Sequence, residues 1–475
     1  MAVANILAED PSSYTRLIVW AALLIATIAV PTAFVIIYNI YLSPLSSYPG
    51  PKASAATSIP YLKALVSGKS CEYVYELHKK YGDVVRISPN ELSYTSSQAW
   101  KDIHTHRPGQ AYPDKEPAFY VHPPNGVPSL FSSNNLYHTR LRRPLAHAFS
   151  EKALRDQDPL IKIYIDTLVE GLRDKATKGE AVDACAWLNW TTFDLMGELS
   201  FGEPFDCLKK QRFDPWVEII FDTVRATAIM GGLRRYPGLQ TLIEFFVPAA
   251  QKELPARHQK MTDDKVARRL ANTTDRQDFM TPLLKNKGHQ EPLTTAELSR
   301  IVTSSKLQEE IRGAFKSEDE INMLSTNSLE YTTAVLEESM RVYPPVPIGM
   351  PRVIPKGGLT VLDKHLPAGT IVSVHQYSSN HSPKYWKDPE SFIPERWMGD
   401  PNYADDDRRI FQPFSTGARN CIGQNLAYAE MRSILARLMY NFDVMLDDEN
   451  HNWLSAQKTY FIWEKGPLMM RFINA

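Results

Sequence analysis

One cysteine in this 475-residue chain lies in a setting that suggests chemistry. Residues 411–423 read FQPFSTGARNCIG, where Cys421 follows a glycine and an arginine and precedes a long apolar helical pattern. A lone cysteine is usually a small buried hydrophobic residue. Alternatively, its thiolate could be a metal ligand or a nucleophile, because glycines allow the backbone to approach the sulfur closely. The rest of the chain must decide between these two interpretations.

The residues around this cysteine follow the pattern F-x-x-G-x-R-x-C-x-G. Its five fixed positions are Phe414, Gly417, Arg419, Cys421 and Gly423. For this composition, a match by chance has a probability on the order of one in tens of thousands, so the pattern is a strong signal. The positive end of the helix that follows would favour a thiolate over a thiol, and Arg419 could meet an anionic group beside a metal.

A second pattern predicts a structural cluster rather than chemistry. Glu338 and Arg341 lie three residues apart in LEESMRVYPPV, on one helical face, and FIPERW supplies Arg396 before the cysteine loop. Three other Glu-x-x-Arg pairs occur in the chain, and we interpret each as a solvated helix face. A buried carboxylate between two guanidinium groups has its charge paired. We therefore expect these three residues to form scaffold.

The elements that must position these residues are mainly helical. Apolar residues recur at spacings of three and four in the segments 70–83, 137–154, 163–176 and 213–230. Short strand-like stretches occur at 84–89, 359–363 and 370–377. A long loop rich in proline, glycine and aromatic residues spans 108–135 and is either a binding loop or plain surface. We expect a mainly α fold with a small β component.

Composition excludes several classes of protein. Lysine and arginine number 53 against 54 aspartate and glutamate, so no nucleic-acid-binding footprint is visible. Four scattered cysteines, none at C-x-x-C spacing, argue against a secreted disulfide framework and for a reducing compartment. A hydrophobic content of 43% is enough for one large core or two ordinary ones.

The N-terminal region predicts a membrane anchor. Residues 17–38 form a run of 22 residues without a charge, long enough to cross a bilayer and too long for a signal peptide. The proline- and serine-rich segment 39–53 is expected to be a short stiff linker. Lysines follow the span and acidic residues precede it, which places the main domain, 54–475, in the cytosol. Residues 1–16 would be an N-terminal tail.

These features together resemble a microsomal cytochrome P-450, particularly the filamentous-fungal members that act in secondary metabolism. The likeness runs from Tyr48 through nearly the whole chain and rests on the Glu-x-x-Arg helix, the PERW segment, the cysteine loop and the anchor with its proline hinge. It implies the cytochrome P-450 fold with an N-terminal transmembrane helix. It also implies haem b as cofactor, with Cys421 as the axial thiolate ligand of the iron, a ligand that favours O–O cleavage.

The resemblance also assigns roles to individual residues. In the cofactor-binding loop, which includes Gly417, Phe414 would pack beside the sulfur and Gly423 would let the backbone pass close. The haem propionates would be bound by four basic residues, Arg419, His138, Arg142 and Arg352, where His138 stands in the place of a tryptophan in many relatives. The structural triad would be Glu338, Arg341 and Arg396. No catalytic residue beyond the haem ligand is identified.

One departure from the family pattern is serious. Relatives carry a long helix over the distal face of the haem, with an A/G-G-x-D/E-T stretch whose acid and alcohol deliver protons to bound oxygen. Here only seven residues separate the flanking landmarks LTTAEL and KLQEEIRGAF, and that stretch occurs nowhere in the chain. Thr303 or Glu297 could substitute for the lost pair. Three explanations compete, namely a lost exon, a decayed relative, or a haem reaction that needs no oxygen activation.

The resemblance implies a haem-thiolate monooxygenase in the endoplasmic reticulum membrane, with one span and a cytosolic catalytic domain. It would oxidise a small lipophilic secondary metabolite, such as a terpenoid, polyketide or alkaloid, with O2. Electrons would come from NADPH through NADPH–cytochrome P-450 reductase, and no nucleic acid would be bound. The alternatives are a membrane-anchored remnant or splice form without full activity, and a haem-dependent rearrangement or dehydration.

Overall fold

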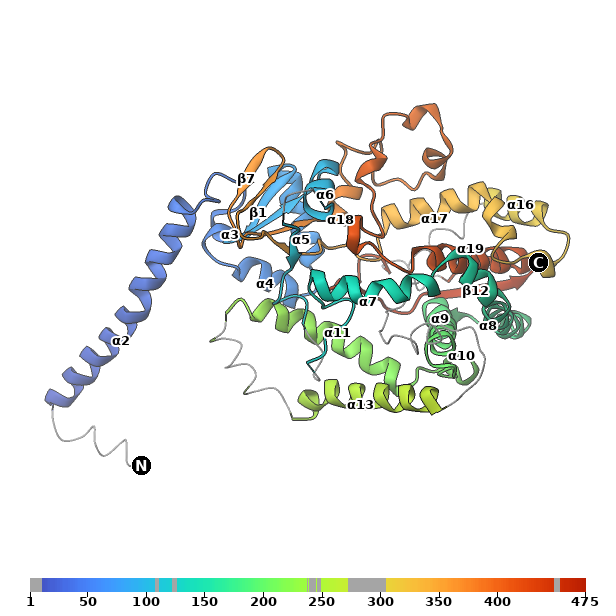
Figure 1. Cartoon of the computed structure of the whole chain (residues 1–475), viewed down its shortest axis with the longest axis horizontal. Helices are drawn as coiled ribbons and strands as arrows, with labels where there is room; N and C mark the ends of the chain where they lie inside the picture. Colours follow the sequence, from blue (N-terminus) through green and yellow to red (C-terminus); the bar gives the residue numbers. More distant parts are fainter. Residues whose placement is uncertain are drawn as a thin grey trace.

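The structure is a computed structural model that describes residues 11–106, 111–121, 126–236, 238, 245, 249–271, 305–447 and 453–475. Its main body is mostly helical, with small sheets at two sides, and one long helix projects from it (Figure 1). The mainly α fold with a small β component that the sequence predicts is confirmed. Thr303, Glu297 and the short segment before Ser305 lie outside the described residues.

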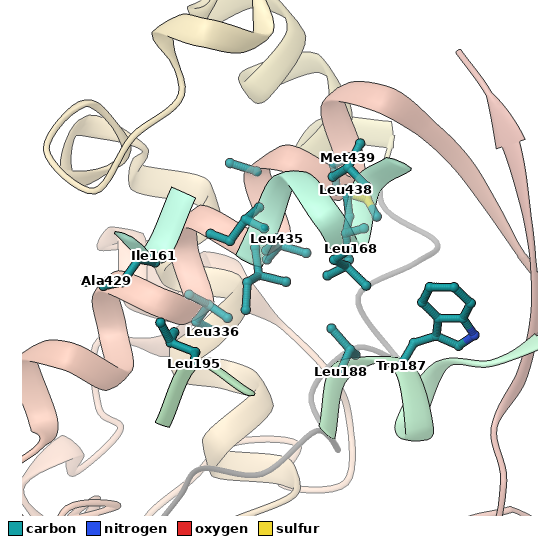
Figure 2. Packing of buried hydrophobic residues seen from close by; sticks show 14 of the residues in the cluster. Ile161, Leu168, Trp187, Leu188, Leu195, Leu336, Ala429, Leu435, Leu438 and Met439 are labelled. Atoms are coloured by element: carbon teal, nitrogen blue, oxygen red, sulfur yellow. The ribbon is translucent and has the colours of Figure 1, made fainter. Parts of the chain in front are cut away.

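Four helices enclose the main hydrophobic core. They are α8 (Glu151–Thr177), α9 (Ala184–Phe201), α17 (Glu330–Val342) and α19 (Gln424–Asn441). Side chains from all four meet in one cluster, as Figure 2 shows for Ile161, Leu188, Leu336 and Leu435. Burial of such apolar area is the largest favourable term in folding, so this core fixes the position of α19 behind the cysteine loop.

The predicted helix over 137–154 is in fact two helices. The first, α7 (Asn135–Ala148), ends just before Ser150, whose side-chain oxygen accepts a hydrogen bond from the N–H of Ala153 at 3.3 Å. A serine in this position satisfies a free N–H at a helix start, so a new helix, α8, begins there. Likewise the strand predicted over 370–377 ends at Val374, because the His375 side chain caps a short helix.

The other described α-helices are α3 (Lys52–Ala56), α4 (Ile59–Val66), α5 (Ser70–Tyr81), α6 (Ser97–His104), α10 (Cys207–Lys210), α11 (Pro215–Leu233), α13 (Ala249–Ala271), α16 (Ser305–Ala314) and α18 (Gln376–Asn380). The short 3-10 helices are η2 (Glu318–Glu320), η3 (Ser325–Ser328), η4 (Pro394–Met398), η5 (Pro401–Tyr403), η6 (Arg408–Ile410) and η7 (Gly417–Arg419).

The largest sheet brings distant parts of the chain together. Its strand order is β1 (Val84–Ser88), β2 (Glu91–Tyr94), β8 (Ile371–Val374), β5 (Arg352–Val353) and β3 (Asp114–Lys115). Because β3 pairs with β5, Lys115 from the predicted long loop lies directly opposite Arg352. A three-stranded sheet joins β4 (Val182–Asp183), β12 (Met469–Asn474) and β9 (Phe442–Leu446), and two hairpins pair β6 (Leu359–Val361) with β7 (Lys364–Leu366) and β10 (Lys458–Thr459) with β11 (Trp463–Glu464).

The N-terminal helix α2 (Pro11–Ile37) continues through a π-helical turn, η1 (Tyr38–Leu42), four residues beyond the predicted end of the anchor. Among the described residues, this is one helix long and apolar enough to cross a membrane, and its apolar span is not buried against the rest of the chain (Figure 1). The segment predicted as a linker packs on the main body, where Leu45 is buried and Arg86 donates to the Asn39 carbonyl at 2.8 Å.

Candidate functional site

The cysteine loop is a closed turn held by its own backbone. The N–H of Cys421 donates to the Phe414 carbonyl at 2.8 Å, and the N–H of Asn420 donates to the Gly417 carbonyl at 3.1 Å. Gly417 has a φ of +77°, and a Cβ atom there would lie 1.8 Å from the His104 carbonyl oxygen. A side chain cannot be accommodated at this point, so glycine is required both by conformation and by space.

Cys421 differs from the other three cysteines because its side chain is exposed, whereas Cys71, Cys185 and Cys207 are buried. It sits three residues before the first residue of α19. The packing around the loop raises the pKa of Cys421, although the N–H of Gly423 and the positive charge of Arg142 oppose the shift. The free thiol is therefore not activated by its surroundings, and coordination to a metal would itself supply the driving force for deprotonation.

Phe414 and Gly423 flank the sulfur in different ways. The ring of Phe414 packs against that of Tyr428 on α19, with centroids 5.2 Å apart, and so ties the start of the loop to the helix behind it. A Cβ atom at Gly423 would lie 3.9 Å from the Cys421 sulfur and 4.0 Å from the Phe149 ring, which are ordinary contacts. The described chain therefore leaves room for a side chain at Gly423, in contrast to Gly417.

The structure brings Glu338, Arg341 and Arg396 together, and all three side chains are fully buried. Arg341 binds Glu338 through both Nε and Nη2 at 2.8 Å, and Arg396 Nε adds a third contact at 3.2 Å. The carboxylate also accepts from the N–H of Ile393 and from the Trp397 indole. We call Glu338, Arg341 and Arg396 the triad.

The remaining guanidinium donors of the triad are also used. Arg341 donates to the carbonyls of Pro389 and Ser391 at 2.7 and 2.8 Å. Arg396 donates to the Lys387 carbonyl at 3.1 Å and forms an ion pair with Asp406. Since buried charges are tolerated only when they are paired and hydrogen-bonded, the triad is a self-sufficient scaffold. It fixes η4 and the segment that leads into the cysteine loop.

The four basic residues predicted to bind propionates lie close to one another, and Arg142 among them also lies close to Cys421; we call Arg419, His138, Arg142 and Arg352 the basic cluster. Arg419 is buried and already bound, because its guanidinium donates to Asn135 Oδ1 at 2.7 and 2.9 Å and to the Ser133 carbonyl at 2.9 Å, and pairs with Asp114 at 3.3 Å. Its pKa is lowered to about 10 by burial and then by the nearby charge of Arg352.

His138 on α7 is neutral at pH 7. It is buried, and burial together with the positive charges of Arg419, Lys115, Arg142 and Arg352 lowers its pKa to about 3. Each of these cations disfavours a further positive charge on the imidazole. His138 can therefore donate one hydrogen bond to an acidic ligand, but it contributes no charge to the site.

Arg142, also on α7, faces the cysteine loop itself. Its Nη1 donates to the Asn420 carbonyl at 2.5 Å and its Nη2 donates to Asn420 Oδ1 at 2.6 Å. Arg142 therefore has two donors committed to the residue next to Cys421, whereas the resemblance predicts a bond to a propionate.

Arg352 is the basic residue whose donors remain open. It is only 3% exposed, yet within the described part of the chain neither its Nε nor its Nη1 has a hydrogen-bond partner. Likewise, neither ring nitrogen of the buried His104 has a hydrogen-bond partner among the described residues. A buried guanidinium without an acceptor is costly, so the position is suited to a group that brings its own negative charge.

These residues fit a haem, the cofactor that the resemblance implies. Among the described residues, no group of three or more histidines, cysteines or acids could hold a metal ion, so an iron bound by Cys421 needs most of its ligands from a cofactor. Haem supplies four ring nitrogens to its iron and carries two carboxylates at its edge. Arg352 offers unpaired donors for such a carboxylate, with His138 and Arg419 close by.

Sequence reasoning missed several residues of this site. Asn420 occupies a variable position of the cysteine pattern, so no local signal marks it as the partner of Arg142. Asp114 and Lys115 lie in a segment predicted as loop, and only the pairing of β3 with β5 reveals that they adjoin Arg352.

Known proteins resemble this chain over most of its length. Residues 51–304 and 302–472 match the family model for cytochrome P450. The chain is 40% identical over 466 residues to the cytochrome P450 monooxygenase astJ of Aspergillus oryzae, covering 92% of this chain and 93% of that protein. It is 42% identical over 464 residues to aclL of the same species, with 92% and 94% covered. It is 38% identical over 473 residues to the averantin hydroxylase of Dothistroma septosporum, with 93% and 89% covered.

The same comparisons bear on the expected gap. The alignment with astJ spans 466 positions, whereas 92% of the 475-residue chain is about 437 residues, so about 29 aligned positions have no residue in this chain. The match to the family model is interrupted at residues 302–304. This interruption falls where the sequence predicts a missing segment.

Proposed function

This chain belongs to the cytochrome P450 family and is an oxidoreductase, and we propose that it oxidises a small lipophilic metabolite by a monooxygenase reaction at a haem held by Cys421. The observation that carries the proposal is the exposed thiol of Cys421 beside a basic cluster in which Arg352 has unpaired buried donors. A thiolate ligand and a cationic edge are the two things that a haem of this type needs from its protein.

Each residue has a defined task in this proposal. When bound, haem supplies the activation of molecular oxygen. Cys421 holds the iron, Arg352 and Arg419 neutralise carboxylate charge, and neutral His138 donates a hydrogen bond at the same edge. The triad keeps the incoming segment rigid, so that the loop presents the sulfur in one position.

The nature of the substrate is inferred from an aromatic cluster next to the basic cluster. Phe119, Tyr120, Phe131 and Phe461 are neighbours, with ring centroids 4.9 to 5.6 Å apart. Lys115, which pairs with Arg352 across β3 and β5, lies over the rings of Tyr120 and Phe131. If these rings face the substrate, they would suit an apolar, planar molecule better than a polar one. An aromatic metabolite is therefore our first choice, with terpenoid, polyketide and alkaloid classes left open, and one relative is named averantin hydroxylase.

Membrane attachment and electron supply complete the proposal. The apolar helix α2 would anchor the chain in the endoplasmic reticulum membrane by one span, with the catalytic domain in the cytosol. Lipophilic substrates partition into that membrane. Electrons would come from NADPH through NADPH–cytochrome P450 reductase, as the resemblance implies.

Two alternatives are retained because of the interruption at residues 302–304. A chain without the distal proton-delivering stretch could catalyse a haem-dependent rearrangement or dehydration, or it could be a splice form or remnant with little activity. Comparing the transcript with the gene around positions 301–306 tests the splice form directly. An in-frame intron-like segment there would show that a longer form is the working enzyme.

The enzymatic test uses the full chain with its anchor, co-expressed in yeast with the reductase. Microsomes receive planar polyketides, terpenoids or alkaloids under ¹⁸O2, and Cys421→Ala microsomes are the matched control. We expect an NADPH-dependent product that contains one ¹⁸O atom and is missing from the control. A product that forms equally under argon would favour rearrangement or dehydration, and a haem-loaded chain without any product would favour the remnant.

A further inference from the structure

A buried arginine joins the apolar N-terminal helix to the main body. Arg86 lies on β1 and is only 1% exposed, and its Nη1 donates to the carbonyl of Asn39 at 2.8 Å. Asn39 belongs to η1, the last turn of the helix that begins with α2. We propose that Arg86 clamps this helix to the catalytic domain, so that the two move as one rigid body and the domain meets the bilayer in one orientation. This inference rests on the proposed membrane attachment.

The end of the helix leaves the Asn39 carbonyl without a donor from its own turn. The N–H of Ser43, the residue after η1, donates to the Tyr38 carbonyl at 2.8 Å, which is the bond of a π-helical turn. The matching donor for Asn39 would be the next residue, but Pro44 has no N–H. Carbonyls at a helix end need donors from elsewhere, and the partial negative charge there favours a cation. Arg86 meets both needs.

The other donors of Arg86 are used at the same junction. Its Nε and Nη2 donate to the Pro89 carbonyl at 3.1 and 2.6 Å, and Nη2 also donates to the Ser43 hydroxyl at 3.3 Å. Burial lowers the pKa of Arg86, and no acid among the described residues opposes that shift. A small swing of the helix that admits no water would leave the guanidinium buried with Pro89 alone, which is costly. The clamped arrangement is therefore favoured.

Two further contacts hold the chain on either side of this clamp. The Asn39 side chain donates to the Ala56 carbonyl at 3.3 Å, and Ala56 ends α3, which packs against β1 (Figure 1). The N–H of Arg86 donates to the Pro49 carbonyl at 2.7 Å. A Cβ atom at Gly50 would lie only 2.5 Å from the Arg86 carbonyl oxygen. The segment between η1 and α3 is therefore bound to β1 at more than one point and is not a free tether.

The clamp also relates the end of the membrane helix to the proposed site. β1 is one edge of the five-stranded sheet, and β3, whose Lys115 lies opposite Arg352, is the other edge. Neighbouring strands are about 4.8 Å apart, so the steps from β1 through β2, β8 and β5 place β3 roughly 19 Å away. Because the sheet is hydrogen-bonded from edge to edge, a helix clamped to β1 keeps a constant distance from the basic cluster. A swinging tether would let that distance vary.

The test measures the distance between a spin label on the helix and one on the main body by double electron–electron resonance. One label replaces Ala33, which is exposed on α2, and the other replaces Lys101, which is exposed on α6. Both are attached through p-azidophenylalanine, because thiol labels would also react with the exposed Cys421. The full chain is measured in detergent and in phosphatidylcholine nanodiscs, as the parent, as Arg86→Gln and as Arg86→Lys.

Leu168→Ala is the matched control for stability. Leu168 is fully buried in the main hydrophobic core, so its truncation destabilises the body without touching the junction. An effect of Arg86→Gln that came only from lower stability would appear in this control as well. Denaturant unfolding of each protein shows how far the stabilities differ.

We expect one narrow distance distribution in the parent, with the same mean in detergent and in nanodiscs. Arg86→Gln should broaden the distribution about twofold or more, since a single amide cannot replace the fork of a guanidinium. Arg86→Lys keeps the charge but loses the fork, so its distribution should have an intermediate width. Leu168→Ala should leave the width unchanged.

A broad distribution in the parent would overturn the inference without any variant, and so would an unchanged width in both Arg86 variants. Equal broadening in Leu168→Ala and Arg86→Gln would make Arg86 a stability residue, which also contradicts the clamp. The distances require neither haem nor substrate, so these outcomes are independent of the proposed oxidation. Failure of the full chain to sediment with phosphatidylcholine vesicles would instead contradict the membrane attachment itself.

Discussion

The triad and Arg352 are both buried and both charged, yet only the triad finds a partner within the chain for each of its charges. Every charge of Glu338, Arg341 and Arg396 meets an opposite charge or a hydrogen-bond partner from the chain. Arg352 is nearly as buried but has donors that no described residue satisfies. A folded chain can support an unsatisfied buried cation where a ligand will complete it. The contrast separates scaffold from binding site without reference to any bound molecule.

The largest expected effect comes from breaking the triad. Glu338→Ala would leave the buried guanidinium of Arg341 without a carboxylate, while Arg396 would keep only its pair with Asp406, and we expect a cost of about 3–5 kcal/mol of stability. The matched control is Glu170→Ala, because Glu170 has the same spacing to Arg173 but is exposed. Unfolding in denaturant should show a large loss for the first variant and almost none for the second. Equal stabilities would mean that the triad is not the scaffold we describe.

The second prediction uses a buried acid to test the same contrast between paired and unpaired buried groups. Glu430 on α19 is 4% exposed, its Oε1 has no partner among the described residues, and burial raises its pKa to about 8. Since the folded state retains the proton between pH 4.5 and 8, stability should fall with rising pH in this window by about 1.4 kcal/mol per unit, and then level off.

Glu430→Gln should remove this slope while leaving stability below pH 4.5 unchanged. Unfolding temperatures measured between pH 4 and 9 provide the check. The same slope in parent and variant would show that Glu430 is paired after all, and that an unpartnered buried acid does not behave as the contrast requires.

A smaller effect on stability is expected in the cysteine loop, which contains Gly417 and Gly423. Gly417→Ala forces a side chain into a left-handed conformation and against the His104 carbonyl, so we expect a loss of at least about 2 kcal/mol. Gly423→Ala, for which the described chain leaves room, should change the apoprotein by less than about 0.5 kcal/mol. Thermal unfolding of both apoproteins distinguishes them. If Gly423→Ala lowers haem affinity alone, that glycine serves the cofactor.

The smallest effect on stability is expected at Arg352, where the contrast with the triad is sharpest. Arg352→Met removes an unsatisfied buried cation, so the apoprotein should keep its unfolding temperature or gain slightly. The variant should nevertheless release haem to apomyoglobin faster than the parent. A strongly destabilised apoprotein with normal haem release would make Arg352 part of the scaffold.

Local patterns made part of this site predictable. The pattern around Cys421 and the Glu338–Arg341 pair each lie within a short stretch of sequence. In the structure, the first forms a hydrogen-bonded turn and the second forms a buried ion pair. The mainly helical fold followed from the periodicity of apolar residues in the same way. Even there, the ends of elements depended on caps, as at Ser150 and His375.

Contacts between distant segments could not be predicted from one sequence. Asn420 and Arg142 are separated by 278 positions, and neither residue type announces the other. The docking of the predicted linker depends on Arg86, a strand residue whose guanidinium reaches back to the Asn39 carbonyl. Such pairings follow from the packed fold, in which the partner of a charge is chosen by geometry and not by spacing along the chain.

The most direct measurement is the absorbance spectrum of the full 475-residue chain, expressed with a haem supply, reduced and exposed to carbon monoxide beside its Cys421→Ala variant. We expect the red-shifted Soret band of a thiolate–CO complex in the parent and its complete loss in the variant. Retention of that band without Cys421 would contradict the assignment of Cys421 as the thiolate ligand of the haem iron. A parent chain that binds no haem at all would contradict it as well.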